Sequence, residues 1–234
     1  MSYILTPPNT CNDCYADITG FESLNKSEIQ IFKEGHCQVN YTNGETIVKE
    51  GTQCNNVICI KEGYAKLHIQ GLDNKNIIIK ILKKGDFIIN PGVFTSTNNI
   101  SQFTVSALSN ISACLMDLDA FHEVFYNNKA FATYVLNLNN NLITNLFNQV
   151  IDLSHKKMSG RVANALLYLS NSIYESHFFK IHLSRQELAD LSSVSKESLL
   201  RILKDFKQDG IIKINGNHIE IVSSDKLRNI SNYG

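Results

Sequence analysis

The chain has 234 residues and a mass of 26.3 kDa; 43% of its residues are hydrophobic and 19% are charged. This apolar content is enough for a hydrophobic core, and the length allows one large domain or two modest ones. The formal net charge is zero, from 22 Lys and Arg against 22 Asp and Glu, so the whole chain carries no signal for binding polyanions.

The charge is nevertheless distributed unevenly. Residues 1–155 contain 10 Lys and Arg against 14 Asp and Glu, whereas residues 156–234 contain 12 against 8. The only arginines of the sequence are Arg161, Arg185, Arg201 and Arg228, all in the last third. Arginine is suited to planar, bidentate recognition of phosphate and guanine. The last third is therefore where nucleic-acid recognition is to be sought.

Targeting signals and membrane spans are not apparent in the sequence. Its apolar runs fall short of the ~18 residues of a transmembrane helix. The start, MSYILTPPNT, lacks the basic region and the apolar region of a secretory signal. We therefore expect a cytoplasmic protein without membrane association, whose six cysteines are mostly reduced thiols.

Residues 40 to 117 consist of short β-rich pieces separated by Gly and Asn. Strands at a spacing of roughly 8–12 residues, with glycines between them, are typical of a sandwich or barrel. This region therefore predicts an antiparallel β-roll. Its apolar pieces are residues 47–48, 57–60, 65–69, 77–82, 87–89, 103–107 and 114–116.

The periodicity changes after residue 118. Asp119 is placed to cap a short helix over residues 120–126, and a long run without Gly or Pro follows. Apolar residues recur in that run at spacings of three and four, which predicts a long helix over residues 127–155. The pattern favours pairing with a second copy through Leu138, Leu142 and Leu146. The alternative is a helix that packs on its own β-roll.

The last region has clear helix and hairpin signals. Residues 161–174 are amphipathic, and Ser184 with Glu187 forms a capping box before a second helix. After a break at residues 192–194, Ser195 is placed to cap a third helix over residues 196–208, which ends before Gly210. Two alternating runs around Asn215-Gly216 then predict a β-hairpin. This order of elements is that of a winged helix-turn-helix.

At this point the chain resembles the Crp/Fnr family of bacterial transcription regulators over nearly its whole length. The stretch LSRQELADLSSVSKESLLRILKDFKQDGIIKINGNHIEI, residues 183–221, is similar to the DNA-binding motif of that family. Gly44, Gly51, Gly63 and Gly85 resemble the glycine framework of its cyclic-nucleotide-binding-like β-roll.

The resemblance implies an α+β protein with three parts. These are a tail and sensory β-roll over residues 1–126, a dimerisation helix over 127–155 and a winged helix-turn-helix over 156–234. It further implies a homodimeric regulator, not an enzyme, that binds a palindromic operator in double-stranded DNA and contacts RNA polymerase. An enzyme on a β-roll of the cupin kind would need a cluster of histidines, whereas the strands here offer isolated His68. A nucleotide-binding module of a larger assembly is the other alternative.

The third helix of this region would be the recognition helix, whose first turn enters the major groove. Arg201 can donate twice to guanine, and Glu197 can accept from cytosine. The family carries Glu and Arg at these two places, where they read a G·C pair, although an exposed pair four residues apart can also be a solvated ion pair. The expected DNA-binding residues are Arg185 and Gln186, for the phosphate backbone, and Ser195, Lys196, Glu197, Ser198 and Arg201. Lys213 and His218 of the wing are further candidates for backbone contacts.

The sensory half departs from the cyclic-nucleotide binders of the family. By alignment, Ile89 and Asn90 replace the Gly-Glu that holds the ribose, and Ser101 and Gln102 replace the Arg-Ser that holds the cyclic phosphate. A buried phosphodiester without a charged donor is poorly compensated. We therefore expect that these four residues line an effector pocket and that cyclic AMP is not the effector.

Cysteines and histidines suggest other signals. Cys11, Cys14 and Cys114 resemble part of the ligand set of oxygen-sensing iron–sulfur members, whose further tail cysteine is replaced by Gly20. A cluster needs a fourth ligand, for which Cys37, Cys54, Cys59 and His36 are candidates. Haem is a further option, with His36, His68 and His122 as candidate axial ligands. A metal or redox signal, another small ligand and no ligand at all remain open.

Overall fold

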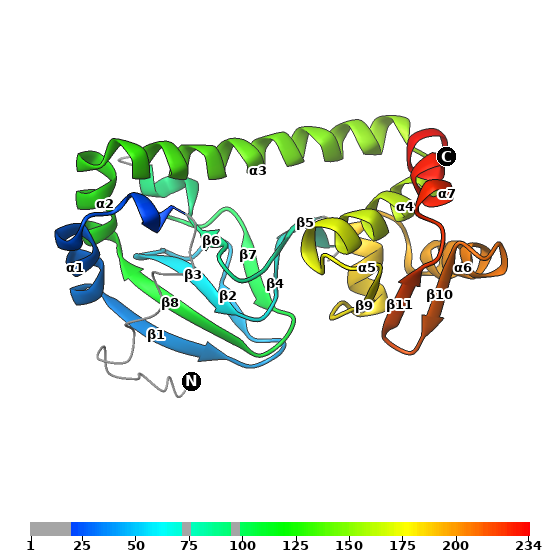
Figure 1. Cartoon of the computed structure of the whole chain (residues 1–234), viewed down its shortest axis with the longest axis horizontal. Coiled ribbons are helices and arrows are strands. Elements are labelled where there is room, and N and C mark those ends of the chain that lie inside the picture. The colour runs from blue at the N-terminus through cyan, green and yellow to red at the C-terminus, as the bar shows by residue number, and fades with distance from the viewer. Residues whose placement is uncertain (1–19, 72–75, 95–98) are drawn as a thin grey trace. The chain divides into compact units, whose positions relative to one another are not determined.

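The computed structural model describes residues 20–71, 76–94 and 99–234. The chain forms two compact units, which are considered separately below (Figure 1). The first comprises Met1–Ile69 and Lys80–Ile143, and the second comprises Gln70–Ile79 and Thr144–Gly234. Cys11 and Cys14 lie outside the described residues.

Two four-stranded sheets form the N-terminal β-roll, and every pairing that the structure describes is antiparallel. The first has the order β1-β8-β3-β6, from β1 (His36–Tyr41), β8 (Ile111–Asp117), β3 (Asn56–Glu62) and β6 (Phe87–Ile88). The second has the order β2-β7-β4-β5, from β2 (Thr46–Val48), β7 (Thr104–Ala107), β4 (Ala65–Gln70) and β5 (Asn76–Leu82). The predicted antiparallel β-roll is confirmed.

Gly63 shows why glycine recurs between these strands. It joins β3 to β4 with φ +92°, and a Cβ at this position would overlap the carbonyl oxygen of Asn110. A residue with a side chain would meet both the unfavourable backbone conformation and this close approach. The turn therefore depends on glycine.

Short helices cover one end of the β-roll. The 3-10 helix η2 (Phe21–Ser23) and α1 (Lys26–Glu34) precede the sheets, and α2 (Leu118–Asn127) follows β8. The cap of α2 is Asp117, whose carboxylate accepts from the amides of Asp119 and Ala120 at 2.9 and 3.2 Å. The prediction that Asp119 caps this helix is therefore wrong by two residues, because the helix begins earlier than its apolar pattern indicates.

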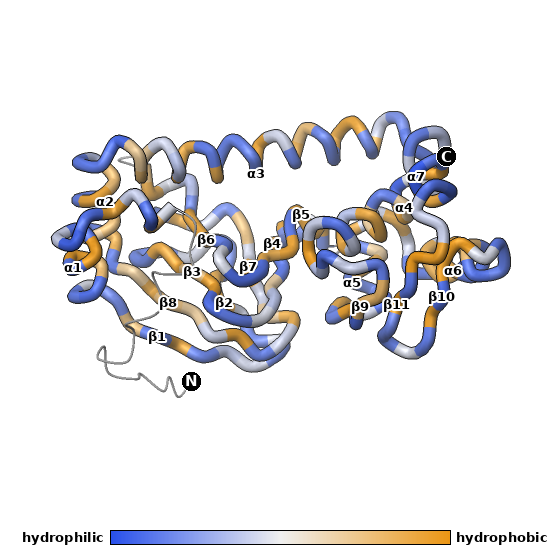
Figure 2. Tube along the Cα trace, viewed as in Figure 1, coloured by the Kyte–Doolittle hydropathy of each residue, from blue (hydrophilic) through white to orange (hydrophobic). Residues whose placement is uncertain are grey.

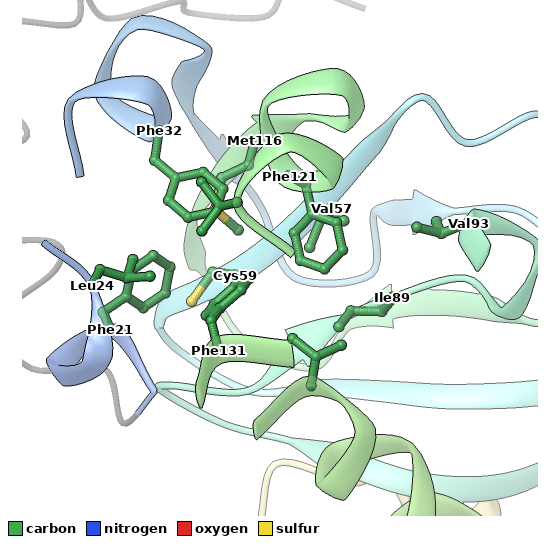
Figure 3. Close-up of a cluster of buried hydrophobic side chains, with 12 residues drawn as sticks. Phe21, Leu24, Phe32, Val57, Cys59, Ile89, Val93, Met116, Phe121 and Phe131 are labelled. Carbon is green, nitrogen blue, oxygen red and sulfur yellow. The ribbon is translucent and has the colours of Figure 1, made fainter. Parts of the chain in front are cut away.

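An aromatic cluster joins these helices to the sheet (Figure 3). Phe21, Phe32, Phe121 and Phe131 come from four different helical segments and lie close to Cys59 of β3. The Phe21 and Phe32 rings meet edge to face, with centroids 5.5 Å apart, and Phe121 meets Phe131 in the same way at 5.7 Å. Such aromatic pairs add to the stabilisation from burial. The cluster anchors the start of α3 (Lys129–His155) on the β-roll.

Apolar residues recur along the whole length of α3 (Figure 2) and form two stripes. The first stripe faces the β-roll. Phe131 and Val135 are buried in the aromatic cluster, Leu138 packs against it, and Leu142 is half-buried. Leu138 and Leu142 thus contact their own β-roll, yet both stay partly exposed in the single chain, so their pairing with a second copy stays a prediction.

The second stripe of α3 is exposed. At 3.6 residues per turn it lies roughly 110° around the helix from the first. Its residues follow spacings of seven, four and three, which is the a/d pattern of a coiled coil. They are Leu136, Ile143, Phe147 and Val150. Leu146, for which pairing with a second copy is predicted, is exposed as well, as are Ile151 and Leu153.

The C-terminal unit contains helices, a small sheet and a hairpin. Its helices are α4 (Met158–Tyr168), continued by the π-helical turn η5 (Leu169–Ile173), then α5 (Arg185–Leu191), α6 (Lys196–Gln208) and α7 (Ser224–Tyr233). Its sheet has the order β10-β11-β9, from β10 (Ile212–Asn215), β11 (His218–Ile221) and β9 (Phe178–Lys180). The predicted winged helix-turn-helix is confirmed, with Gly216-Asn217 between the hairpin strands where Asn215-Gly216 was expected. In the described part of the chain, no helix is long and apolar enough to cross a membrane.

Candidate nucleic-acid interface

Side-chain caps fix the two helices of the helix-turn-helix. The Ser184 hydroxyl accepts from the Glu187 amide at 3.2 Å, and the Glu187 carboxylate accepts from the Ser184 amide at 2.7 Å. The Ser195 hydroxyl accepts from the Ser198 amide at 3.1 Å and so begins α6. Each cap satisfies amides that a helix start leaves without partners. Both caps are as the sequence predicts.

Helix α6 separates an apolar face from a polar one. Its buried residues are Leu199, Ile202, Leu203 and Phe206. The side chains of Ser195, Lys196, Glu197 and Arg201 are exposed, whereas Ser198 is half-buried. A helix held from behind in this way can place its polar face into a major groove.

Glu197 and Arg201, the two expected base readers of α6, are not paired with each other. Among the described side chains, no ion pair joins Glu197 to Arg201, although the two are four residues apart. The pKa of Glu197 is lowered, chiefly by a hydrogen bond to its own backbone amide and then by one from Ser195. Glu197 is therefore ionised and remains an acceptor, while the Arg201 guanidinium remains a donor.

Arg185 and Gln186, at the start of α5, differ in their surroundings. Arg185 Nη2 donates to the carbonyl oxygen of Gly216 at 3.1 Å and so connects α5 to the turn of the wing. Gln186 is exposed and donates to Asp190 at 2.8 Å. The structure thus gives Arg185 a role in the free chain that the sequence did not indicate.

The wing presents a mixed surface. Lys213 pairs with Glu220 at 3.2 Å, so part of its charge is compensated in the free chain. The exposed ring of His218 stacks on Phe178 with centroids 5.6 Å apart and planes at 12°. This contact joins β11 to β9 and keeps the imidazole at the surface.

The four expected effector residues do not converge on one open pocket. Ser101 is 1% exposed, and its hydroxyl donates to the carbonyl of Phe103 at 2.7 Å. Asn90 is 3% exposed, and its amide nitrogen has no hydrogen-bond partner among the described atoms. Ile89 is buried in the apolar core, whereas Gln102 is exposed and donates to the carbonyl of Ile100 at 3.3 Å.

The cavity beside them is small and mostly apolar. Its volume is about 40 Å³, and its lining includes Leu67, Leu82, Ile89, Phe103 and Leu142. Lys80 is at its edge and pairs with Asp86 at 2.7 Å. Sites for drug-sized ligands occupy roughly 300–1,000 Å³. The described cavity is therefore far too small for a nucleotide without rearrangement.

The described cysteines do not assemble an iron–sulfur site. Cys114 is buried on β8 directly opposite Cys59 of β3, and burial raises the pKa of both thiols. A cluster needs thiolates, which burial disfavours. A Cβ at Gly20, the position of the missing family cysteine, would overlap the ring of Tyr134. Among the residues described, no group of three or more His, Cys, Asp or Glu could hold a metal ion.

The histidines considered for haem each make a local hydrogen bond. The closest contacts are His36 Nδ1 with the carbonyl of Lys33 and His122 Nε2 with that of Val93, both at 2.7 Å. His68 Nε2 lies 3.2 Å from the Ser106 hydroxyl. These bonds orient the rings within their own domain, and nothing in this geometry favours one histidine as a ligand.

Two family models match the chain, one over the β-roll and one over the helix-turn-helix region. Residues 38–128 match the cyclic nucleotide-binding domain, and residues 160–230 match the Crp-like helix-turn-helix domain. The matched regions include both β-sheets in large part, α5, α6 and the wing. The chain belongs to the Crp/Fnr family of transcription regulators.

Individual relatives agree over most of their length. The chain is 24% identical to a CRP-like cAMP-activated global transcriptional regulator of Mycobacterium tuberculosis, over 88% of this chain and 93% of the relative. A solved Crp/Fnr-family regulator from Eubacterium rectale has a TM-score of 0.74 at 18% identity and covers 92% of this chain and 98% of its own. FixK2 from Bradyrhizobium japonicum has a TM-score of 0.75 at 17% identity, over 83% and 96%. Regulators of this kind bind DNA as dimers and are not, in general, enzymes.

Proposed function

We propose that the chain is a homodimeric, sequence-specific regulator that binds a palindromic operator through α6. The observation that carries this proposal is the capped α6, with a buried apolar face and with Glu197 and Arg201 exposed and unpaired with each other on the opposite face. Glu197 and Arg201 would read a G·C pair in each half-site, and Lys196 would contact a neighbouring base or phosphate. Arg185 and Gln186, at the start of α5, would contact the DNA backbone.

The exposed stripe of α3 supports a seam between two copies. Leu136, Ile143, Phe147 and Val150 follow coiled-coil spacing and lack partners that would bury them in one chain. A two-fold dimer along α3 would present two α6 helices with the symmetry of a palindrome. RNA polymerase would be a further partner of the DNA-bound dimer.

The signal would be something other than cyclic AMP. The cited relative from M. tuberculosis is described as cAMP-activated. In this chain, however, Ser101 and Gln102 occupy the expected phosphate positions, and neither carries a charge. Another small ligand, or a metal or redox signal that includes Cys11, Cys14 and Cys114, would then act on the β-roll.

Selection from a random pool of duplexes tests the DNA-binding proposal. We expect an inverted repeat, and an affinity that falls steeply with salt because the bound cations release counterions from DNA. Recovery of no enriched motif under reducing conditions, with oxygen and without, would contradict it. An absorption spectrum and metal analysis of protein purified without oxygen test the metal signal: absence of iron, with no visible absorption, would exclude both haem and an iron–sulfur cluster.

A further inference from the structure

The turn between α5 and α6 has an unusual backbone. Ser193 adopts φ +51°, a left-handed conformation that costs free energy for any residue with a Cβ. The neighbouring Ser192 is buried, and its hydroxyl donates to the carbonyl of Leu188 at 2.8 Å. Because this turn sets the direction in which α6 leaves α5, whatever stabilises it also positions the recognition helix.

Arg161 of α4 holds this turn through its guanidinium. Its Nε donates to the carbonyl of Ser192 at 3.3 Å, and its Nη2 donates to the carbonyl of Ser193 at 3.2 Å. Carbonyls at the end of a helix lack intrahelical partners and carry partial negative charge. Arg161 therefore stabilises both the end of α5 and the strained residue that follows it.

The same guanidinium also reaches the segment between α3 and α4. Arg161 Nη1 donates to the carbonyl of Lys156 at 2.9 Å. The carboxylate of Asp152, in the last turn of α3, is already engaged by Lys156 at 2.9 Å and by Asn164 at 2.7 Å. Among the described residues, no carboxylate pairs with Arg161. All its recorded hydrogen bonds go to backbone carbonyls.

We propose that Arg161 is a positioning residue for DNA recognition, because it ties the linker after α3 to the turn before α6. The guanidinium is planar, so its three bonds share one rigid frame, and the linker carbonyl and the turn carbonyls are held at fixed positions relative to each other. The half-buried Arg161 is not offered as a DNA contact. The proposal rests on DNA binding through α6 and adds a residue outside that helix.

Arg161→Lys tests the proposal, because lysine keeps the charge but cannot reproduce three directed bonds. We expect about a tenfold loss of affinity for the selected operator, since charge-assisted hydrogen bonds are lost. Affinity for non-specific DNA should stay the same, so the ratio of the two should fall. The matched control is Arg228→Lys, the same substitution at an exposed position on α7.

Ser193→Gly is the second test of whether Arg161 stabilises the turn, because glycine adopts φ +51° without strain. In the Arg161→Lys background it should restore part of the lost operator affinity, and it should have little effect alone. Hydrogen exchange without DNA should be faster at the amides of residues 193–195 in Arg161→Lys, and slower again in the double variant.

The possible failures are distinguishable. If Arg161→Lys binds the operator like the unmodified protein, with unchanged exchange at the turn, Arg161 has no positioning role. An equal loss for operator and non-specific DNA would instead make Arg161 a phosphate contact and would overturn the proposal. If the unmodified protein selects no DNA sequence, the proposed function fails, while the exchange measurement still tests whether Arg161 holds the turn.

Discussion

Arg201 and Arg185 are two cations of the same unit in different surroundings. Arg201 is exposed on α6 and, in the described structure, has no recorded partner, whereas Arg185 already donates to the carbonyl of Gly216. A free guanidinium four residues after Glu197 suits a base edge, whereas one beside the wing turn suits a phosphate.

Arg201→Ala should therefore weaken operator binding by about 1–3 kcal/mol and relax the preference at one base pair per half-site. Arg185→Ala should weaken binding to all sequences alike and reduce the salt dependence. Competition binding against duplexes with each base substituted in turn measures both effects. Uniform losses for both variants would mean that our division between base reader and phosphate contact is wrong.

His182, in the segment between β9 and α5, makes the stability of the C-terminal unit depend on pH. Burial, and then the charge of Lys180, lower the pKa of its ring, which lies 3.3 Å from the Tyr174 hydroxyl. The unfolded chain therefore binds a proton that the folded chain disfavours, and stability falls as pH drops below the ordinary histidine pKa of about 6.5. The loss levels off below the lowered pKa of the folded state.

Replacing His182 with Gln should remove the part of the pH dependence of stability that comes from this histidine. Between pH 7.5 and pH 5.0, the melting temperature of the unmodified protein should fall by more than that of His182→Gln. His155→Gln, at an exposed position on α3, is the control. A pH profile that is identical for all three proteins would contradict the assignment.

At the same scale, the sequence reveals some functional residues and conceals others. Glu197 and Arg201 can be predicted from the sequence because the cap of α6, its polar face and the spacing of the two residues are all local features. Arg161 cannot, since its partners lie five, 31 and 32 residues away and are backbone carbonyls. Neither residue type nor spacing in the sequence predicts that the Arg161 side chain donates to backbone carbonyls.

Among the elements, those with strong local signals are the predictable ones. Gly63, the capping box of Ser184 with Glu187 and the Ser195 cap mark ends of strands and helices that the structure confirms. Helices α1 and α7 were not anticipated, although Asn25 with Glu28 forms a capping box before α1. Strand β9 has only three residues and is paired through β11, so its existence depends on a tertiary contact.

Helix α3 shows the limit of periodicity. From the sequence, pairing with a second copy and packing on the β-roll are alternatives, but a helix with two apolar stripes can do both. The spacing of Leu138 and Leu142 is helical in either case, so it cannot say which surface they meet. The burial of Phe131 and Val135 assigns the first stripe to the β-roll, whereas the second stripe is exposed in the single chain.

Phe147→Lys tests the second stripe. Phe147 is 64% exposed in the single chain, so lysine there should leave the fold intact, while a two-fold seam would bring two like charges together. We expect sedimentation to show monomers at concentrations where the unmodified protein is dimeric. Asn141→Lys, exposed on another side of α3, should remain dimeric. A dimer that is unchanged by Phe147→Lys would remove the second stripe from the interface.

For the molecule as a whole, the two halves differ in what they offer a ligand. The C-terminal unit exposes cations on an ordered helix, and all four arginines of the sequence lie in the last third. The β-roll matches the cyclic nucleotide-binding domain, and at Ser101 and Gln102, where we expect the phosphate contacts, the side chains are uncharged. This combination favours a regulator that binds DNA as its family does but responds to an effector other than a cyclic nucleotide.

Cyclic AMP and cyclic GMP should therefore neither bind nor alter operator affinity at micromolar concentrations. A buried cyclic phosphate would lose its charge-assisted partners, at ~1.5–3 kcal/mol each, because Ser101 is turned to the Phe103 carbonyl and Gln102 is exposed. Two such losses lower a micromolar affinity to roughly millimolar or worse, at ~1.4 kcal/mol per tenfold. Calorimetric titration, with operator binding measured in parallel, checks both statements. A micromolar constant for either nucleotide would show that the cavity of about 40 Å³ opens and that backbone or lysine donors replace the missing arginine.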